Sequence, residues 1–189
     1  MKYVKHKIFT IGAFEQEEKW LNEMAAKGML LTDVGFCRYV FEEGTPGKYI
    51  YRLEMLENTP THPESVAYIK FVEETGAEQV GSIMRWVYFR KKAVDGPFDL
   101  YSDLGSKLKH YRRIHAICNI MIPLELLIGA INMSVAIMGG GVGGFREISS
   151  QVNISVGLLC LGLGIWFICI SSSIYKKIKV LKKESAIRE

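Results

Sequence analysis

The chain has 189 residues, of which 49% are hydrophobic and 23% are charged, and its formal net charge is +4. Residues 1–106 carry 13 basic and 16 acidic side chains, so the positive excess lies in two short clusters, 107–113 and 175–189. Because no basic face extends over a whole domain, the composition argues against a nucleic-acid-binding protein, and we expect no direct nucleic acid binding.

Strand-like and helix-like patterns alternate along residues 1–106. A short strand is expected over 6–11. The next segment, 14–27, predicts a helix because its apolar residues recur at helical spacing before Gly28. A long run over 30–41 is rich in apolar residues and is typical of a strand.

The alternation continues to the end of this region. Turn-forming residues over 42–47 join the run over 30–41 to another strand over 49–56, which predicts a β-hairpin. A second helix is expected over 63–74, and a closing strand rich in β-branched and aromatic residues over 79–90. The order βαββαβ predicts an α+β domain of ferredoxin-like topology, in which two helices cover one face of a four-stranded antiparallel sheet.

The other face of this sheet is left uncovered by the helices and is expected to carry aromatic side chains together with an arginine. One interpretation places these residues in the core or against a second copy of the chain. The other makes them a face for a ligand or a protein partner. The strand register determines which residues lie on this face, for example Tyr49 or Tyr51. The candidate residues of this face are Tyr39, Tyr51, Arg52, Trp86 and Tyr88.

Four carboxylates crowd the first predicted helix, and paired acids can act as general acid and base. They lie in its first turns, where negative charge interacts favourably with the helix dipole, so we expect a solvated face instead. These residues are Glu15, Glu17, Glu18 and Glu23. No catalytic pattern is recognised elsewhere in the sequence, and the protein is expected not to be an enzyme.

The cysteines and histidines do not have the spacing of a metal site. Cys118, Cys160 and Cys169 fall in apolar segments, and only Cys37 belongs to residues 1–106. A reducing compartment then predicts no disulfide. We accordingly expect neither a metal nor a cofactor.

Two apolar stretches cover residues 114–138 and 152–174. The length of each is close to that of a helix that crosses a bilayer, which is about 20 residues, so the sequence predicts a transmembrane hairpin. Basic residues precede the first stretch in the juxtamembrane segment 107–113 and follow the second in the tail 175–189. The connecting Gly-rich segment 139–151 has a single basic residue. By the positive-inside rule both termini are expected in the cytoplasm and the loop outside, in a multi-pass protein of a bacterial cell membrane.

The predicted external loop contains the pattern G-x-G-x-x-G at Gly139, Gly141 and Gly144. This pattern binds a dinucleotide when it lies between a strand and a helix. Here the preceding segment is a predicted membrane helix, so we interpret the pattern as a flexible turn.

Glu125 is the one formally charged residue inside the two apolar stretches, and a carboxylate at mid-membrane costs about 2.5–3.5 kcal/mol. Cys118, Glu125 and Asn132 are spaced by seven and share one helical face. The second stretch offers a face of small residues, so the two faces are expected to meet and to pair the helices or join copies of the chain. An ion or proton path through Glu125 is the alternative. The expected pairing residues are Glu125, Asn132, Gly157, Cys160 and Gly164.

Three segments of the chain resemble one protein family. They are residues 17–28 with the sequence EEKWLNEMAAKG, residues 46–52 with PGKYIYR and residues 85–92 with RWVYFRKK. On these residues the region 1–110 is similar to the domain of unknown function family 2812. The resemblance implies a bacterial, typically Gram-positive, protein with a carboxy-terminal membrane portion, often encoded beside PadR-type transcriptional regulators. It implies a regulatory circuit but supplies no activity and no catalytic residues.

These observations together predict a membrane-anchored cytoplasmic binding module with a sensory or regulatory role, linked to a PadR-type regulator. The expected partners are the lipid bilayer and either a second copy of the chain, in a homo-oligomer, or another membrane or regulatory protein. The alternative function is that of a membrane subunit of an oligomeric transporter or pore.

Overall fold

The computed structural model describes residues 1–101, 103–138 and 144–188. The chain divides into two compact units, which we call the N-terminal unit, Met1–His110, and the helical unit, Tyr111–Glu189. Helix α3, Leu104–Met138, begins in the first unit and continues into the second.

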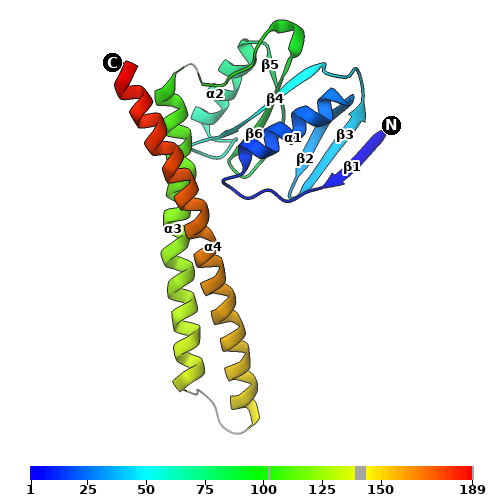
Figure 1. Cartoon of the computed structure of the whole chain (residues 1–189). Helices are drawn as coiled ribbons and strands as arrows, with labels where there is room; N and C mark the ends of the chain where they lie inside the picture. The colour runs from blue at the N-terminus through cyan, green and yellow to red at the C-terminus, as the bar shows by residue number, and fades with distance from the viewer. Residues whose placement is uncertain (102, 139–143, 189) are drawn as a thin grey trace. The chain divides into compact units, whose positions relative to one another are not determined.

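Within the described residues, the N-terminal unit contains six strands, two helices before α3 and a single 3₁₀ turn, Ala93–Asp95 (Figure 1). Strands and helices follow one another in the order βαβββαββ. They are β1 (Lys2–His6), α1 (Phe14–Ala26), β2 (Met29–Gly35), β3 (Arg38–Glu43), β4 (Tyr49–Met55), α2 (Pro63–Glu74), β5 (Ala77–Ile83) and β6 (Trp86–Lys92).

The strands form two antiparallel three-stranded sheets. The order is β1-β3-β2 in the first sheet and β4-β6-β5 in the second, so each sheet is built by one βαββ unit in which the outer first strand pairs with the third. The first sheet has a bulge between Leu31 and Asp33, and the second has one between Gln79 and Gly81. The two bulges lie 48 positions apart in the chain, which identifies the βαββ units as an internal repeat.

The same spacing of 48 residues relates the two helices. Leu21 of α1 and Ile69 of α2 are both buried, and a glycine with positive φ follows each helix, at Gly28 and Gly76. Gly28 is required for a second reason, because a Cβ atom there would lie 2.7 Å from the carbonyl oxygen of Gly44. Glycine therefore allows the chain to leave the helix in a left-handed conformation and to enter the next strand.

The prediction of single strands over 30–41 and 79–90 is wrong, because each run folds back on itself as a hairpin. The turns are two residues long, Phe36–Cys37 and Met84–Arg85, and one residue of each adopts positive φ. Such turns usually contain Asn or Gly at these positions. Neither turn does, so the sequence has no turn signal inside either run.

The α+β class is confirmed, but the ferredoxin-like topology is not, because the strands form two sheets instead of a single four-stranded one. The helices predicted over 14–27 and 63–74 agree with α1 and α2 within one residue. The first strand lies earlier than expected, at Lys2–His6 and not over 6–11.

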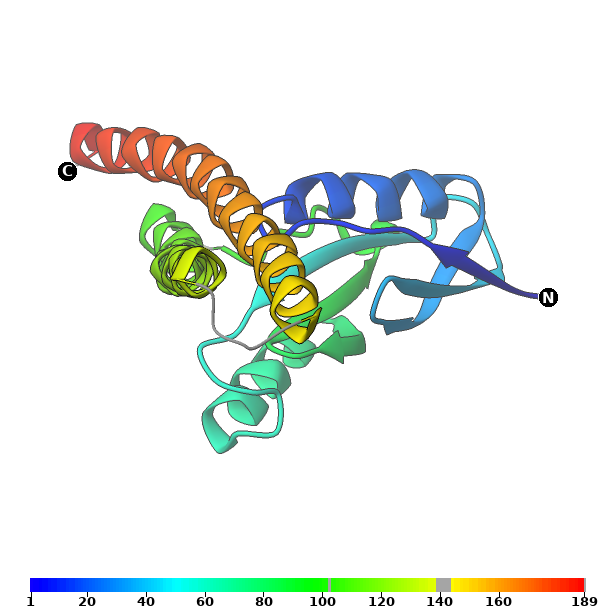
Figure 2. The same ribbon diagram turned by 90° about the horizontal axis from the view of Figure 1, so that it is seen from below.

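The second sheet lies between the two helices, with α1 on one side and α2 on the other (Figure 2). Its side chains alternate accordingly. Tyr88 belongs to a core with α1 and the first sheet, whereas Val87 and Phe89 belong to a core with α2. The expectation that both helices cover the same sheet face is therefore wrong.

The helical unit consists of the remainder of α3 and of α4, Gly144–Arg188, which run side by side in an antiparallel pair (Figure 1). Both helices are long and apolar enough to cross a membrane. Large apolar side chains point away from the pair. They include Ile120, Leu124, Leu127 and Ile131 on α3, and Leu158, Leu159, Ile165 and Trp166 on α4.

The expected spans 114–138 and 152–174 lie within these two helices, but the helices extend further. The juxtamembrane segment 107–113 and the tail as far as residue 188 are helical as well. Of the expected external loop 139–151, residues 139–143 lie outside the described residues, with the first two glycines of the G-x-G-x-x-G pattern. The rest of that loop already belongs to α4, which begins at Gly144.

Candidate functional site

Helix α1 covers the edge of β4 with polar side chains. The Asn22 Oδ1 atom accepts a hydrogen bond from the Tyr51 N–H at 2.8 Å, and Asn22 Nδ2 donates to the Tyr51 carbonyl oxygen at 3.1 Å. Two residues along, the Leu53 N–H donates to Glu18 Oε1 at 2.8 Å. These bonds satisfy backbone groups that an edge strand otherwise presents to solvent or to another chain. The side chains of α1 thus take the place of a neighbouring strand.

Glu17, on the same helix, joins the two sheets. It is buried, and its Oε1 atom accepts hydrogen bonds from the hydroxyl groups of Tyr39 at 2.7 Å and Tyr88 at 2.6 Å. Tyr39 lies on β3 of the first sheet and Tyr88 on β6 of the second. Burial raises the pKa of Glu17 above its ordinary value, although the two tyrosine hydrogen bonds act in the opposite direction.

The two tyrosines respond in turn to the carboxylate. Burial raises the pKa of both phenols well above the ordinary value, and the negative charge and hydrogen bonding of Glu17 raise it further. Both hydroxyl groups therefore remain protonated and act as donors at all physiological pH values.

Glu18 is a partly buried carboxylate whose pKa lies near neutral pH. Burial raises its pKa from 4.5 to about 7, although the hydrogen bond from Leu53 and the positive charge of Arg52 act to lower it. A folded-state pKa above the unfolded value means that the folded protein binds the proton more tightly. The corresponding stability is present at acidic pH and is lost as the pH rises through about 7.

We therefore expect the N-terminal unit to become less stable between pH 5 and pH 8, with Glu18 contributing about 2–3 kcal/mol to the loss. Glu18→Gln keeps an oxygen acceptor for the Leu53 N–H but does not titrate, so its stability should change less over this interval. Unfolding of the full chain in detergent, followed by tryptophan fluorescence at several pH values, measures the free energy of unfolding of the wild type and of the variant. A Glu18→Gln variant with the wild-type pH slope would contradict the assignment.

The expectation of a solvated acidic face on α1 is wrong for half of its members. Glu15 and Glu23 are exposed, but Glu17 is buried and Glu18 is partly buried. The sequence contained a signal for this, because Glu17 precedes Leu21 by four positions and Met24 by seven, on the buried face of the helix.

The aromatic face expected from the sequence is an interior surface. Tyr39, Tyr51 and Tyr88 are buried between α1 and the two sheets, and Trp86 packs against the same core. The Tyr51 hydroxyl group accepts a hydrogen bond from the Leu31 N–H at 2.9 Å, which ties β2 to the second sheet. These aromatic residues therefore do not form an exposed ligand platform.

Arg52 does not belong with the aromatic residues. It is paired with Phe89 in the sheet register, and Phe89 faces α2. Because neighbouring residues on a strand point to opposite faces, Arg52 lies on the opposite side of β4 from Tyr51. Its Nη1 atom donates to the carbonyl oxygen of Tyr51 at 2.9 Å.

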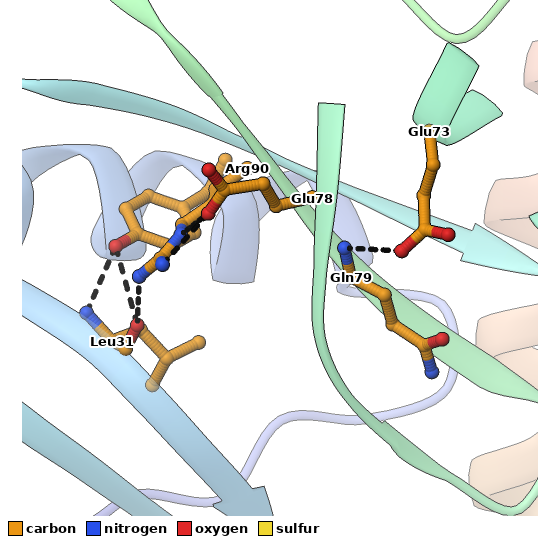
Figure 3. Close-up of polar contacts among 6 residues, drawn as sticks. Leu31, Glu73, Glu78, Gln79 and Arg90 are labelled. Atoms are coloured by element: carbon orange, nitrogen blue, oxygen red, sulfur yellow. Dashed lines mark hydrogen bonds and ion pairs between the residues drawn. The ribbon is translucent and has the colours of Figure 1, made fainter. Parts of the chain in front are cut away.

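Arg90, which the sequence analysis did not single out, links the two sheets at another point (Figure 3). Its Nη2 atom lies 2.8 Å from Glu78 Oε2, and its Nη1 atom donates to the Leu31 carbonyl oxygen at 3.4 Å. The guanidinium carbon also lies 4.4 Å from the centre of the Tyr49 ring. In the same region of Figure 3, Glu73 of α2 accepts a hydrogen bond from the Gln79 N–H at 3.4 Å.

His110 and Glu54 are two buried ionisable residues that lie side by side in the N-terminal unit. Both residues are buried, with 3.4 Å between Nδ1 and Oε1. The same Nδ1 atom lies 3.4 Å from the Met55 N–H nitrogen, at the next outward-facing position of the β4 edge after Leu53. Three aromatic rings, those of Phe14, Tyr101 and Trp86, pack within 5.7 Å of the imidazole ring. This histidine, the last residue of the unit, fixes the start of α3 to the second sheet.

In the helical unit, the structure brings together some of the expected pairing residues. The Glu125 Cβ atom would lie 3.6 Å from a Cβ atom built at Gly164, so Glu125 lies beside α4. A Cβ atom at Gly164 would lie 2.8 Å from Leu126, so the helices meet closely there. Asn132 instead donates to the Ile128 carbonyl oxygen of its own helix at 2.8 Å, and this bond does not join α3 to α4.

A close backbone contact of the two helices involves Gly129, which was not among the expected pairing residues. Cβ atoms built at Gly129 and Gly157 would each lie 3.2 Å from the carbonyl oxygen of the other residue. Gly157 additionally faces the Met133 side chain at 3.0 Å. Nearer the predicted cytoplasmic end, Ser171 donates to Asn119 at 3.4 Å. The small residues of α4 thus match a glycine of α3, as expected of closely packed membrane helices.

Comparison with known proteins gives one match. A family model described as "Protein of unknown function (DUF2812)" matches residues 13–122. The matched region begins just before α1, whose polar side chains connect the two sheets, and ends within α3. No curated protein matches the chain, and no solved structure matches it.

Proposed function

This chain belongs to the DUF2812 family, and we propose that it is a membrane-anchored protein whose N-terminal unit acts in the cytoplasm as a binding module with a sensory or regulatory role. The family description assigns no activity. The proposal is therefore built on the outward-facing apolar surface of the helical unit and on the way the N-terminal unit uses its charged groups.

The observation that carries the proposal is the distribution of side chains on α3 and α4. Large apolar residues such as Leu127 and Leu159 point outward, while Gly129 and Gly157 lie between the helices. A helix pair in water would place its large apolar side chains inside, whereas lipid favours the opposite arrangement. The pair therefore suits a bilayer-spanning anchor, with the basic flanks of both helices on the cytoplasmic side.

A binding role is supported by the way in which the N-terminal unit uses its polar side chains for its own structure. Glu17, Glu18 and Asn22 bind tyrosine hydroxyls or the backbone of β4, and Arg90 is paired with Glu78. Glu17 and Arg90 hold the two sheets together, and Glu18 and Asn22 hold α1 to β4. We propose that the surface of this rigid unit contacts a regulatory protein, and the family resemblance makes a PadR-type transcriptional regulator the first candidate.

The second candidate function, a membrane subunit of an oligomeric transporter or pore, is supported by the position of Glu125 within α3 and beside Gly164 of α4. A carboxyl group within the membrane is costly and is often functional. Two spans alone do not enclose a channel, so this function requires several copies of the chain. A ring of copies in native mass measurements from lipid discs would favour it over the binding module.

The proposed topology predicts a definite labelling pattern. In a background without the four native cysteines, Ser149→Cys should react with an impermeant thiol reagent on intact cells. Ser106→Cys should react only after the membrane is permeabilised. The reverse pattern would place both termini outside and would exclude a cytoplasmic role.

The binding role itself is tested by cross-linking in native membranes, followed by affinity purification and mass spectrometry. We expect a regulatory protein to be cross-linked to residues of the N-terminal unit. Recovery of cross-links only between helical units of several copies would support the membrane-subunit function instead.

A further inference from the structure

The turn between β2 and β3 places an aromatic side chain in solvent. Phe36 is 86% exposed at the tip of this two-residue turn. The Lys7 N–H donates to the Cys37 carbonyl oxygen at 3.2 Å, which extends the pairing of β1 with β3 as far as the turn. Ile8, which is 80% exposed, therefore lies beside the turn as well. Two large apolar side chains thus project from one end of the first sheet.

The surroundings of these two residues are basic. Lys5 and Lys7 are both exposed on the segment that pairs with β3, and His6 is paired with Arg38 in the sheet register. Arg38 is bonded to Asp33 at 2.7 Å, so that carboxylate offsets the arginine. The Lys7 ammonium group lies over the Trp20 ring at 4.7 Å, a contact that leaves its positive charge in place. We call Lys5, Lys7, Ile8, Phe36 and Arg38 the tip patch. Its positive charge contrasts with the excess of acidic residues over basic ones in residues 1–106.

We propose that the tip patch docks on the anionic surface of the cytoplasmic leaflet, with Phe36 and Ile8 entering the headgroup region. Aromatic and aliphatic side chains next to basic residues fit a lipid interface, where the apolar groups are buried and the basic groups meet lipid phosphates. This inference rests on the proposed cytoplasmic location, because that leaflet carries the anionic lipids.

A bilayer fits the tip patch better than a folded protein does. A protein partner would need a concave pocket to receive side chains on a narrow turn, whereas a lipid surface deforms around them. The chain also continues from this unit into the proposed span of α3, so the leaflet is present at a high effective concentration. A weak lipid contact is then sufficient to hold the unit in one orientation.

The proposal is tested with the full chain in lipid discs that contain either phosphatidylcholine alone or phosphatidylcholine with 30% phosphatidylglycerol. Phe36→Cys, in a background without the native cysteines, carries an environment-sensitive fluorophore. Phe71→Cys, at an exposed apolar position of α2, is the matched control. Quenchers on the lipid headgroups and upper acyl chains report contact with the bilayer.

We expect the label at position 36 to shift to the blue and to be quenched by lipid in the anionic discs, with a weaker signal in phosphatidylcholine and at high salt. The label at position 71 should not be quenched. Changing Lys5 and Lys7 together to glutamate should lower the ratio of docked to free states by more than about tenfold. The same charge change at the exposed Lys27 and Lys70 should have little effect.

Two outcomes would overturn the inference. Absence of lipid quenching at position 36 would show that the tip patch does not meet the bilayer. A blue shift without lipid quenching would assign the patch to a contact with protein. In either case the cysteine-labelling pattern at Ser149 and Ser106 still decides separately whether the N-terminal unit is cytoplasmic.

Discussion

Replacement of Glu17 by leucine should lower the free energy of unfolding of the N-terminal unit by about 2–4 kcal/mol. The substitution removes the common acceptor of the Tyr39 and Tyr88 hydroxyl groups, both of which are buried. A buried donor left without a partner costs about 1–3 kcal/mol, and two are created here. Denaturant unfolding of the full chain in detergent, followed by the fluorescence of Trp20 and Trp86, measures the change.

Two further variants separate the hydrogen bonds from the helix itself. Glu23→Leu lies on the same helix but at an exposed position, and should change stability by less than about 0.5 kcal/mol. The triple variant Glu17→Leu, Tyr39→Phe, Tyr88→Phe removes the donors together with the acceptor, so it should recover most of the loss. A triple variant no more stable than Glu17→Leu would mean that packing around Glu17, and not the paired hydroxyls, is responsible.

The second large effect is expected at the glycine contact between α3 and α4. Gly157→Leu should weaken helix pairing by at least about 1–3 kcal/mol, since the new side chain would meet Met133 and the backbone of Gly129. Gly162→Leu is the matched control, because nothing lies within 4 Å of a Cβ atom at that position of the same helix. Unfolding in mixed micelles with increasing sodium dodecyl sulfate compares the stability of the helix pair in the Gly157→Leu and Gly162→Leu variants.

Glu125→Gln should disturb the pair less than either bulky substitution at a facing glycine. Hydrogen bonds between membrane helices are worth only about 0.6 kcal/mol on average, and glutamine has nearly the same size as glutamate. Gly164→Ile, which faces Leu126, should be the more damaging change. Loss of a cellular phenotype in Glu125→Gln, with unchanged expression and oligomer size, would instead favour an ion or proton role.

The helices could be predicted well because their signals are local. The apolar spacing in 14–27 and 63–74, each followed by glycine, is sufficient to locate α1 and α2. The hairpins inside 30–41 and 79–90 could not be predicted in this way. Their turns consist of Phe-Cys and Met-Arg pairs, and left-handed backbone at Cys37 and Met84 is imposed by the pairing of the flanking strands.

The burial of the candidate aromatic residues could not be predicted without the two hairpins. In the predicted four-stranded sheet, Tyr39 and Tyr88 would lie on the face that the helices leave uncovered. With six strands, the first sheet and α1 cover them, and the carboxylate of Glu17 is buried with them. The pairing residues of α4 were easier to predict, because small residues at a spacing of seven, Gly157, Gly164 and Ser171, mark one helical face. Their partner Gly129 could not be chosen without knowing how far α3 and α4 are shifted along each other.

The 48-residue spacing of the two βαββ units has a consequence for the history of the fold. Duplication and fusion of one short gene segment would leave this spacing. The product of a single segment would have buried the apolar face of its sheet against a second copy. The halves have since diverged: the position of α2 equivalent to Glu17 is Ser65, which is also buried but carries no charge. The ancestral dimer would have presented two identical halves, whereas the fused chain carries the carboxylate in only one. The buried carboxylate that joins the two sheets therefore comes from one half only, although both halves have the same strand order.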